Sequence, residues 1–270
     1  MPDTSLTPAP GPRRFPLGKW RRAHQKDDDR LTPLMKAIKA VHSATSSAST
    51  NPEDLEKQRA GQELFGKLVT PALGLRTDPL TLRHGPVPVP AEWVRLDAGH
   101  DRNHAVLYCH GGGYTCGQLG YARVLASKLA LATGFDVLSF EYRLSPEHPY
   151  PAAVQDALGA WDTLAYLGYG ARDIFVAGDS AGGNLALELA LRLKEQGRRQ
   201  PRGLPPTLIQ VGSNEILFSD SERLHAALQR QGVFSVLEEY PDCWHVFQQM
   251  PTRAAAQAMD SAGRFVRRVV

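Results

Sequence analysis

The sequence has few of the features that mark secreted, membrane-spanning or metal-binding proteins. Its 270 residues include three cysteines, Cys109, Cys116 and Cys243, an odd number without a C-x-x-C pair. A disulfide framework is therefore not expected, and reduced thiols favour a cytoplasmic location. No run approaches the roughly 18 apolar residues of a membrane span, and the N-terminus has no apolar signal core.

The net charge is also small, +3 at pH 7, which implies neither nucleic acid nor an anionic membrane as a partner. With 42% hydrophobic and 22% charged residues, the composition is that of a globular protein. A chain of this length can form one large α/β domain. Prolines and basic residues crowd the first 30 residues, which we predict to be a flexible tail.

Apolar runs alternate with helical patterns along the rest of the chain. Strands are expected at residues 91–96, 104–110, 135–142, 173–177, 208–211 and 235–240. Helices are expected at residues 31–45, 51–69, 121–133, 152–167, 184–196, 221–231 and 252–269, with a turn at 101–103. This alternation predicts a doubly wound, mostly parallel sheet. We divide the chain into a tail (1–30), a helical cap region (31–84) and an α/β domain (85–270).

One stretch organises that domain: Gly178-Asp179-Ser180-Ala181-Gly182. It follows an apolar strand and opens an alanine- and leucine-rich helix, the context in which G-x-S-x-G presents a nucleophilic serine. Ser180 must then lie on a strained turn, and the two glycines avoid collisions with neighbouring backbone. The pattern predicts that Ser180 is a nucleophile and that the amide of Ala181 faces the oxyanion.

A serine nucleophile needs a base and an acid, which follow it in the order Ser, acid, His when it lies on such a turn. His225 and His245 are the only downstream histidines. His225 falls in a helical pattern and is expected to face solvent, whereas His245 follows the last strand and is the predicted base. Glu215 and Asp220 both follow the 208–211 strand. Glu215 is preferred because it lies nearer the strand end, and Asp220 fits the start of a helix.

Glycines after the 104–110 strand supply the remaining catalytic feature. Gly111 and Gly112 allow the backbone to approach a substrate, and their amides are predicted to form the oxyanion hole with Ala181. His110 precedes the serine in the chain and is expected to anchor this loop rather than to act as the base. Cys109 and Cys243 adjoin predicted site residues, and buried packing is their expected role.

Together these pieces resemble the hormone-sensitive-lipase-like branch of the α/β-hydrolases. The matching stretches are His110-Gly111-Gly112-Gly113-Tyr114, the run from Tyr142 to Ala153, Gly178-Asp179-Ser180-Ala181-Gly182-Gly183, the run from Leu204 to Gly212, and Trp244-His245. The resemblance covers residues 85–268. It implies that residues 85–270 form an α/β-hydrolase catalytic domain, that carboxylic esters are the substrates, and that no cofactor or metal is needed. It also implies a cap built partly from the N-terminal helices.

The chain departs from that family after the nucleophile helix. The family has a further sheet strand and a helical insertion before the Leu-Pro-Pro strand, whereas here Gly197 is followed closely by Leu204-Pro205-Pro206. One core strand is therefore expected to be missing. If the 208–211 strand paired directly with the elbow strand, the acid and histidine loops would shift by about 4.8 Å, one strand spacing.

We therefore predict a serine hydrolase that cleaves small carboxylic esters, with short acyl chains favoured because the missing segment leaves a shallower pocket. Hydrolysis of amide or acetyl groups would use the same residues. The alternative is a catalytically impaired hydrolase-like protein with a binding role, because a missing strand leaves a sheet edge that invites association, including a homodimer.

Overall fold

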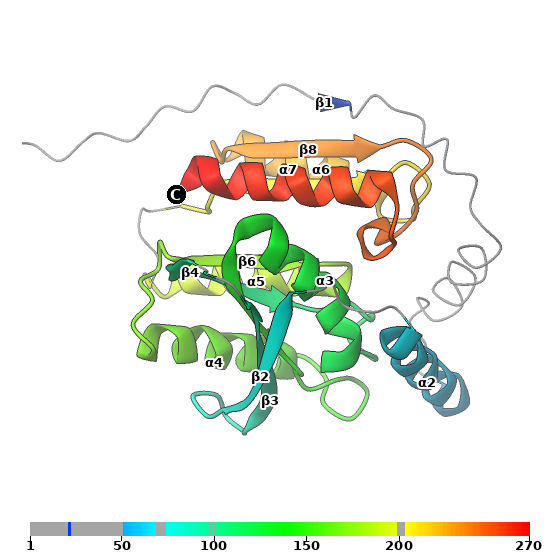
Figure 1. Ribbon diagram of the computed structural model, residues 1–270, viewed down its shortest axis with the longest axis vertical. Helices are drawn as coiled ribbons and strands as arrows, with labels where there is room; N and C mark the ends of the chain where they lie inside the picture. Colours follow the sequence, from blue (N-terminus) through cyan, green and yellow to red (C-terminus); the bar gives the residue numbers. More distant parts are fainter. Residues whose placement is uncertain (1–20, 23–50, 69–73, 98, 100, 199–202) are drawn as a thin grey trace, which may run out of the picture.

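The computed structural model describes residues 21–22, 51–68, 74–97, 99, 101–198 and 203–270 (Figure 1). The expected tail, apart from residues 21–22, and the expected 31–45 helix lie outside these residues. The strands are β1 (Arg21–Arg22), β2 (Leu75–Leu82), β3 (Val89–Leu96), β4 (Asp101–Cys109), β5 (Phe135–Phe140), β6 (Ile174–Gly178), β7 (Thr207–Gly212) and β8 (Ser235–Tyr240). The helices are α2 (Pro52–Leu68), α3 (Leu119–Thr133), α4 (Ala152–Tyr166), α5 (Ala181–Glu195), α6 (Phe218–Arg230) and α7 (Arg253–Val269), with a short 3-10 helix, η1, at Phe247–Gln249.

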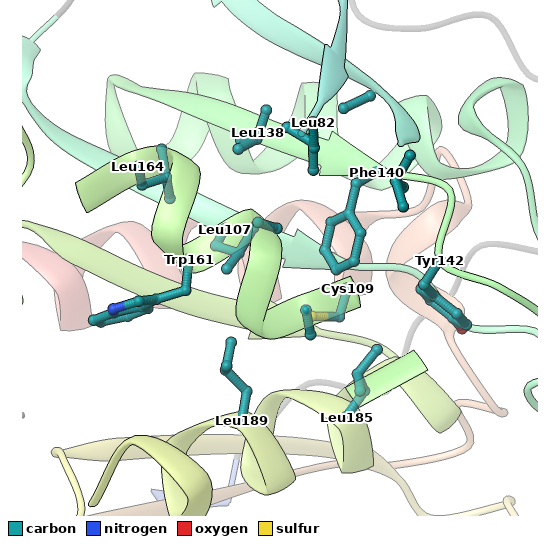
Figure 2. Close-up of a cluster of buried hydrophobic side chains, with 14 of the residues drawn as sticks. Leu82, Leu107, Cys109, Leu138, Phe140, Tyr142, Trp161, Leu164, Leu185 and Leu189 are labelled. Atoms are coloured by element: carbon teal, nitrogen blue, oxygen red, sulfur yellow. The ribbon is translucent and has the colours of Figure 1, made fainter. Parts of the chain in front are cut away.

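The core consists of apolar strands covered by helices on both faces. Every residue of β5 is buried, as is β4 from Ala105 onward. Because strands covered on both faces have no solvent side, their sequences are almost continuously apolar. Leu107 and Leu138 of the sheet face Trp161 and Leu164 of α4 and Leu185 of α5 in one cluster (Figure 2). A second cluster packs α3 against the opposite face. The predicted α/β fold with a mostly parallel sheet is confirmed.

The strands form two hydrogen-bonded sets rather than one sheet. The first has the order β2-β3-β5-β4-β6, and the second has the order β1-β8-β7. Of the strand pairs that the structure describes, β2–β3 and β3–β5 are antiparallel and the others are parallel. Within the described residues no strand pairs with the free edge of β6 or of β7. The expectation of a sheet one strand short is therefore confirmed, but the direct pairing of β7 with the elbow strand is wrong.

Two local expectations also need correction. The predicted helical cap region, 31–84, contains the strand β2, which pairs with β3 along its whole length, so the sheet begins before residue 85. The predicted turn at 101–103 lies instead in β4, where Asp101 pairs with Phe135 before a register shift. The helix expected at 51–69 is confirmed as α2.

Arg59 fastens α2 to the loops that follow β4 and β5. Its Nε donates to the carbonyl oxygen of Thr115 at 2.9 Å, and Nη1 and Nη2 each donate to the Glu147 carboxylate at 2.8 Å. Nη2 also reaches the Ser145 carbonyl oxygen at 3.3 Å. A planar guanidinium can satisfy a carboxylate and neighbouring carbonyls at once, so one side chain joins three segments.

We expect Arg59→Ala to speed hydrogen exchange of the α2 amides by roughly 2- to 10-fold, because these bonds are only partly shielded from water. The hydrogen bond from Arg59 lowers the pKa of Glu147 from 4.5 to about 2. The stabilising contribution of the Arg59–Glu147 ion pair is therefore fully present above the ordinary pKa of Glu147. It is lost as the pH falls through about 2, where the carboxylate takes up a proton. Lys67→Ala is the control because, among the described residues, Lys67 forms an ion pair with Glu63 of the same helix and with no other element. Equal exchange in the two variants would contradict the assignment.

Candidate active site

Ser180 lies on the sharp turn between β6 and α5. Its backbone has φ +53° and ψ −124°, in a region that non-glycine residues rarely occupy. The turn brings the chain back so closely that a Cβ at Gly178 would collide with the Gly182 carbonyl oxygen. A Cβ at Gly182 would collide with the carbonyl oxygen of Cys109 in β4. Glycine at both places therefore allows the strained turn on which Ser180 is presented.

We expect Gly182→Ala to lower the free energy of unfolding by about 3 kcal/mol or more, because the new methyl group meets backbone that cannot move aside. Gly183→Ala is the matched control, since a Cβ there would lie 3.4 Å from the nearest atom, the Gly178 carbonyl oxygen. That change should alter stability by less than about 1 kcal/mol. Urea unfolding of both variants tests the difference, and equal losses would contradict this reason for glycine.

Ser180, His245 and Glu215 form a continuous hydrogen-bonded relay. Nε2 of His245 lies 2.8 Å from Oγ of Ser180, and Nδ1 lies 3.1 Å from Oε1 of Glu215. Because a carboxylate only accepts, Nδ1 carries the hydrogen and Nε2 is left to accept the serine proton. The second carboxylate oxygen, Oε2, accepts from the Gly212 amide at 2.9 Å and so fixes the acid at the end of β7. The three predicted residues meet with the geometry of a base-activated nucleophile.

The two rival side chains lie elsewhere. Asp220 is in the first turn of α6, where its carboxylate pairs with Arg223. His225 was expected to face solvent, but it is 5% exposed and its Nδ1 lies 2.9 Å from Oγ of Ser235 on β8. The helical pattern of the sequence predicted helix α6, but it did not predict that the face of α6 carrying His225 packs on β8. Burial lowers the pKa of His225.

The glycine loop, residues 110–114, requires one correction. The Gly111 amide donates to Oδ1 of Asp179 at 2.9 Å, so it does not face an oxyanion site. In the described part of the chain, the amides of Gly112, Gly113 and Ala181 donate no hydrogen bond. Gly112 and Gly113 have φ of +122° and +61°, which glycine adopts without penalty. The amides of Gly112, Gly113 and Ala181 are therefore available to donate hydrogen bonds to a bound group, whereas the Gly111 amide is already paired with Asp179.

Asp179 is the functional neighbour that the sequence pattern did not assign. Its Oδ1 also accepts from Tyr108 Oη at 2.5 Å, which ties β4, the glycine loop and the elbow together. Burial raises the pKa of Asp179, and the hydrogen bonds from Tyr108 and Gly111 act in the opposite direction. The only sequence signal was an aspartate directly before the nucleophile, which by itself names no partner.

His110 anchors the loop from within the core, as its place before the serine suggested. Its Nδ1 lies 2.8 Å from the Gly111 carbonyl oxygen, and its ring stacks on Tyr142 with the centroids 4.1 Å apart. Burial lowers its pKa to about 4, so the imidazole is neutral at pH 7. Cys109 and Cys243 are buried, in agreement with a packing role.

A cavity of about 190 Å³ lies between the glycine loop, the loop before α4, and helices α4 and α5. Its lining includes Tyr114, Val154 and Asn184, and Tyr114 Oη donates to Asn184 Oδ1 at 2.7 Å. Ser180 precedes the first residue of α5 and Asn184 lies about one helical turn further along, so α5 connects the strained turn to the wall of this cavity.

The described residues offer neither a metal-binding cluster nor a membrane-spanning helix. Those residues contain no group of three or more His, Cys, Asp or Glu side chains placed to hold a metal ion. Nor do they include a helix with the length and hydropathy required to traverse a lipid bilayer.

Comparison with known proteins bears on the family and the fold of this chain. A family model described as "alpha/beta hydrolase fold" matches residues 106–204 and 200–249. The two matched segments meet at the short connection after Gly197, where the sequence predicts that a strand of the family is missing. An acetyl-hydrolase from Streptomyces hygroscopicus is 29% identical, over 87% of this chain and 95% of the relative. The alignment with this relative spans 295 positions, more than the 270 residues of the chain. The sequence of this chain is therefore interrupted by gaps in that alignment.

Two further relatives carry informative descriptions. An ethyl acetate hydrolase from Pseudomonas putida is 37% identical over 55% of this chain and 45% of the relative. A crystal structure described as an esterase from the bacterial hormone-sensitive lipase family matches with a TM-score of 0.76 at 26% identity. That match covers 87% of this chain and 97% of the solved chain.

Proposed function

Because the chain belongs to the alpha/beta hydrolase fold family, in its hormone-sensitive-lipase-like branch, and is a carboxylic ester hydrolase, we propose that it works through a serine acyl-enzyme. The observation that carries the proposal is the unbroken relay from Ser180 through His245 to Glu215. A serine hydroxyl becomes nucleophilic when a positioned base removes its proton, and this relay supplies the base and its orienting acid.

In the first half of the reaction, Oγ of Ser180 attacks the ester carbonyl and Nε2 of His245 takes the hydroxyl proton. The new carbonyl oxyanion accepts hydrogen bonds from the amides of Gly112 and Ala181, with Gly113 as a further donor. Glu215 stabilises the imidazolium. Each such donor typically lowers the barrier by about 2.7–4 kcal/mol because it is already oriented.

Collapse of the tetrahedral intermediate breaks the bond to the alcohol, which leaves with the proton from His245. Water then repeats the sequence on the acyl-serine: His245 takes its proton, the hydroxide attacks the acyl carbon, and Ser180 regains the proton as the acid departs. Atoms balance as one ester and one water giving one acid and one alcohol.

We further propose that short acyl chains are preferred. The cavity lined by Asn184, four residues after Ser180, is small, about 190 Å³. Two relatives are described as hydrolases of acetyl groups or ethyl acetate. We expect kcat/KM for p-nitrophenyl acetate or butyrate to exceed that for the decanoate by at least about 10-fold, because added methylenes outgrow the cavity. A maximum at the decanoate would contradict the preference without contradicting the serine mechanism.

The alternative of an impaired hydrolase-like protein is motivated by the unpaired edges of β6 and β7. A fluorophosphonate probe separates the two possibilities, because it captures only an activated serine. Covalent labelling at Ser180 supports the esterase proposal. An intact protein that stays unlabelled at Ser180 favours the impaired protein.

A further inference from the structure

The backbone directly after His245 is strained. Val246 has φ +52° and ψ +38°, in the left-handed region that a β-branched residue rarely adopts. Such a conformation persists only where the surrounding structure fixes it. The short helix η1 follows at once. The direction in which the His245 side chain points therefore depends on what holds residues 246–250 in place.

The loop that carries His245, residues 241–250, is called here the histidine loop. Its first half is held by the loop after β7, where the Asn214 amide donates to the Cys243 carbonyl oxygen at 2.9 Å. Glu215 is the next residue of that same loop, and it contacts Nδ1 of His245. Because β7 and β8 pair with each other, this contact lies within one set of strands.

The second half of the histidine loop lies against α3, on the side of the other set of strands. Val246 is buried in one cluster with Leu125 and Leu129 of α3, and the same cluster contains residues of β4 and β5. Ser180 follows β6, which belongs to that set. Contacts between α3 and the histidine loop therefore bear on the distance between His245 and Ser180.

Lys128 of α3 joins this half of the loop by hydrogen bonds. Its Nζ donates to the carbonyl oxygens of Gln248 at 2.7 Å and Met250 at 2.8 Å. Carbonyl oxygens at the end of a helical turn carry partial negative charge, which a cation stabilises. Burial lowers the pKa of Lys128 to about 8, so the ammonium group is mostly charged at pH 7. Hydrogen bonds from a charged donor are roughly twice as strong as neutral ones.

The position of Lys128 on α3 is unusual for a cation. Tyr121, Leu125 and Leu129, which recur with it at helical spacing, are all buried and apolar or aromatic. Placing an ammonium group on such a face costs free energy unless its donors are satisfied. The partners found for it in the described part of the chain are the two carbonyls of the histidine loop.

We propose that Lys128 is a positioning residue for the base: it holds the end of η1 so that the strained turn at Val246 keeps Nε2 of His245 within reach of Oγ of Ser180. This inference rests on the proposed function, because it assigns Lys128 a part in that same reaction. Lys128 acts through the backbone and touches no reacting atom. Because Glu215 is held from the side of β7, loss of Lys128 weakens the contact with Ser180 and leaves the contact with Glu215.

Lys128→Met tests the proposal, since methionine fills much of the same space but cannot donate. A displacement of about 1 Å can lower a rate by about 100-fold. We therefore expect kcat for p-nitrophenyl acetate and the rate of fluorophosphonate labelling to fall by about 10- to 100-fold at pH 7, with KM within about twofold. Lys194→Met is the matched control, because Lys194 is exposed near the end of α5 and should leave all three quantities unchanged.

Chemical rescue separates the ammonium group from the bulk of the side chain. Lys128→Ala opens room for a small amine, and propylammonium restores the missing carbons and the N–H donors. We expect it to raise kcat of Lys128→Ala by at least about fivefold, because the donors return to the two carbonyls. Tetramethylammonium carries the same charge without an N–H group and should have no effect. Circular dichroism checks the folding of both variants, and if Lys128→Met fails to fold, the rescue of Lys128→Ala decides.

Nuclear magnetic resonance with isotope-labelled histidine distinguishes positioning from general damage. The proton on Nδ1 of His245 reports the hydrogen bond to Glu215, and it should stay protected from exchange in Lys128→Met. Loss of that proton together with kcat would overturn the proposal, because the whole histidine loop would then have come apart. Unchanged kcat and labelling in Lys128→Met, or no response to propylammonium, would overturn it while the wild type remains an active esterase. A wild-type protein without hydrolysis or labelling would instead overturn the proposed function and this inference together.

Discussion

Ser180→Ala should lower kcat for a short-chain ester by about 10⁴- to 10⁶-fold, the largest functional effect expected for any single change in this chain. Removing Oγ leaves His245 and Glu215 in place but with no atom to activate. The residual rate should not vanish, because the amides of Gly112 and Ala181 can still stabilise an oxyanion formed by water. The free energy of unfolding should change little, since Ser180 is only half-buried and the change removes a single oxygen atom.

The measurement is steady-state hydrolysis of p-nitrophenyl acetate together with fluorophosphonate labelling. Ser221→Ala is the matched control: its Oγ donates to the Leu217 carbonyl within α6, away from the relay. Full activity and no loss of labelling are expected for Ser221→Ala. If Ser180→Ala kept the wild-type rate and the label, Ser180 would not be the nucleophile.

Glu215→Gln should lower kcat by about 10⁴-fold, although glutamine has nearly the same shape. The carboxylate accepts two hydrogen bonds, from His245 Nδ1 and from the Gly212 amide. Glutamine has one acceptor oxygen, and if that oxygen faces Gly212 its NH₂ group faces Nδ1. Nδ1 must then accept, Nε2 carries the hydrogen, and the imidazole can no longer take the proton of Ser180.

Asp220→Asn distinguishes the two acids that follow β7. Asp220 pairs with the exposed Arg223 on the surface of α6, so its change should leave kcat within about twofold of wild type. Circular dichroism and kcat measured on both variants separate folding from chemistry. A large loss for Asp220→Asn with none for Glu215→Gln would reverse the assignment of the acid.

The main features of the site followed from order along the chain, because a strand, a turn and a helix fix where each functional loop emerges. The relay of Ser180, Glu215 and His245 has the arrangement expected from those loops. The direction of the Gly111 amide could not be predicted from that order. Gly111 turns toward Asp179, a residue 68 positions away, and no local pattern encodes that distant hydrogen bond.

The predictions of the fold that were wrong have similarly specific causes. Pro79 lies in the middle of β2, and proline usually argues against a strand. Among the described strands, β2 pairs with β3 alone and so lies at the sheet edge, where proline is tolerated. The missing strand was apparent from the short connection after Gly197. The length of that connection does not specify whether β7 pairs with β6, and among the described residues the two strands lie in different sheets.

The relay also has a mechanical consequence. Ser180 follows the last strand of one set and Glu215 follows the edge strand of the other, with His245 between them. The hydrogen bonds of the relay therefore link two sets of strands that share no backbone ladder among the described residues. Anything that tightens or breaks that tie, such as a covalent adduct on the serine or protonation of the imidazole, is coupled to how firmly β7 and β8 are held. The three side chains proposed for the chemical step therefore also form one of the links between the two sets of strands, beside the packing of α7 on α3.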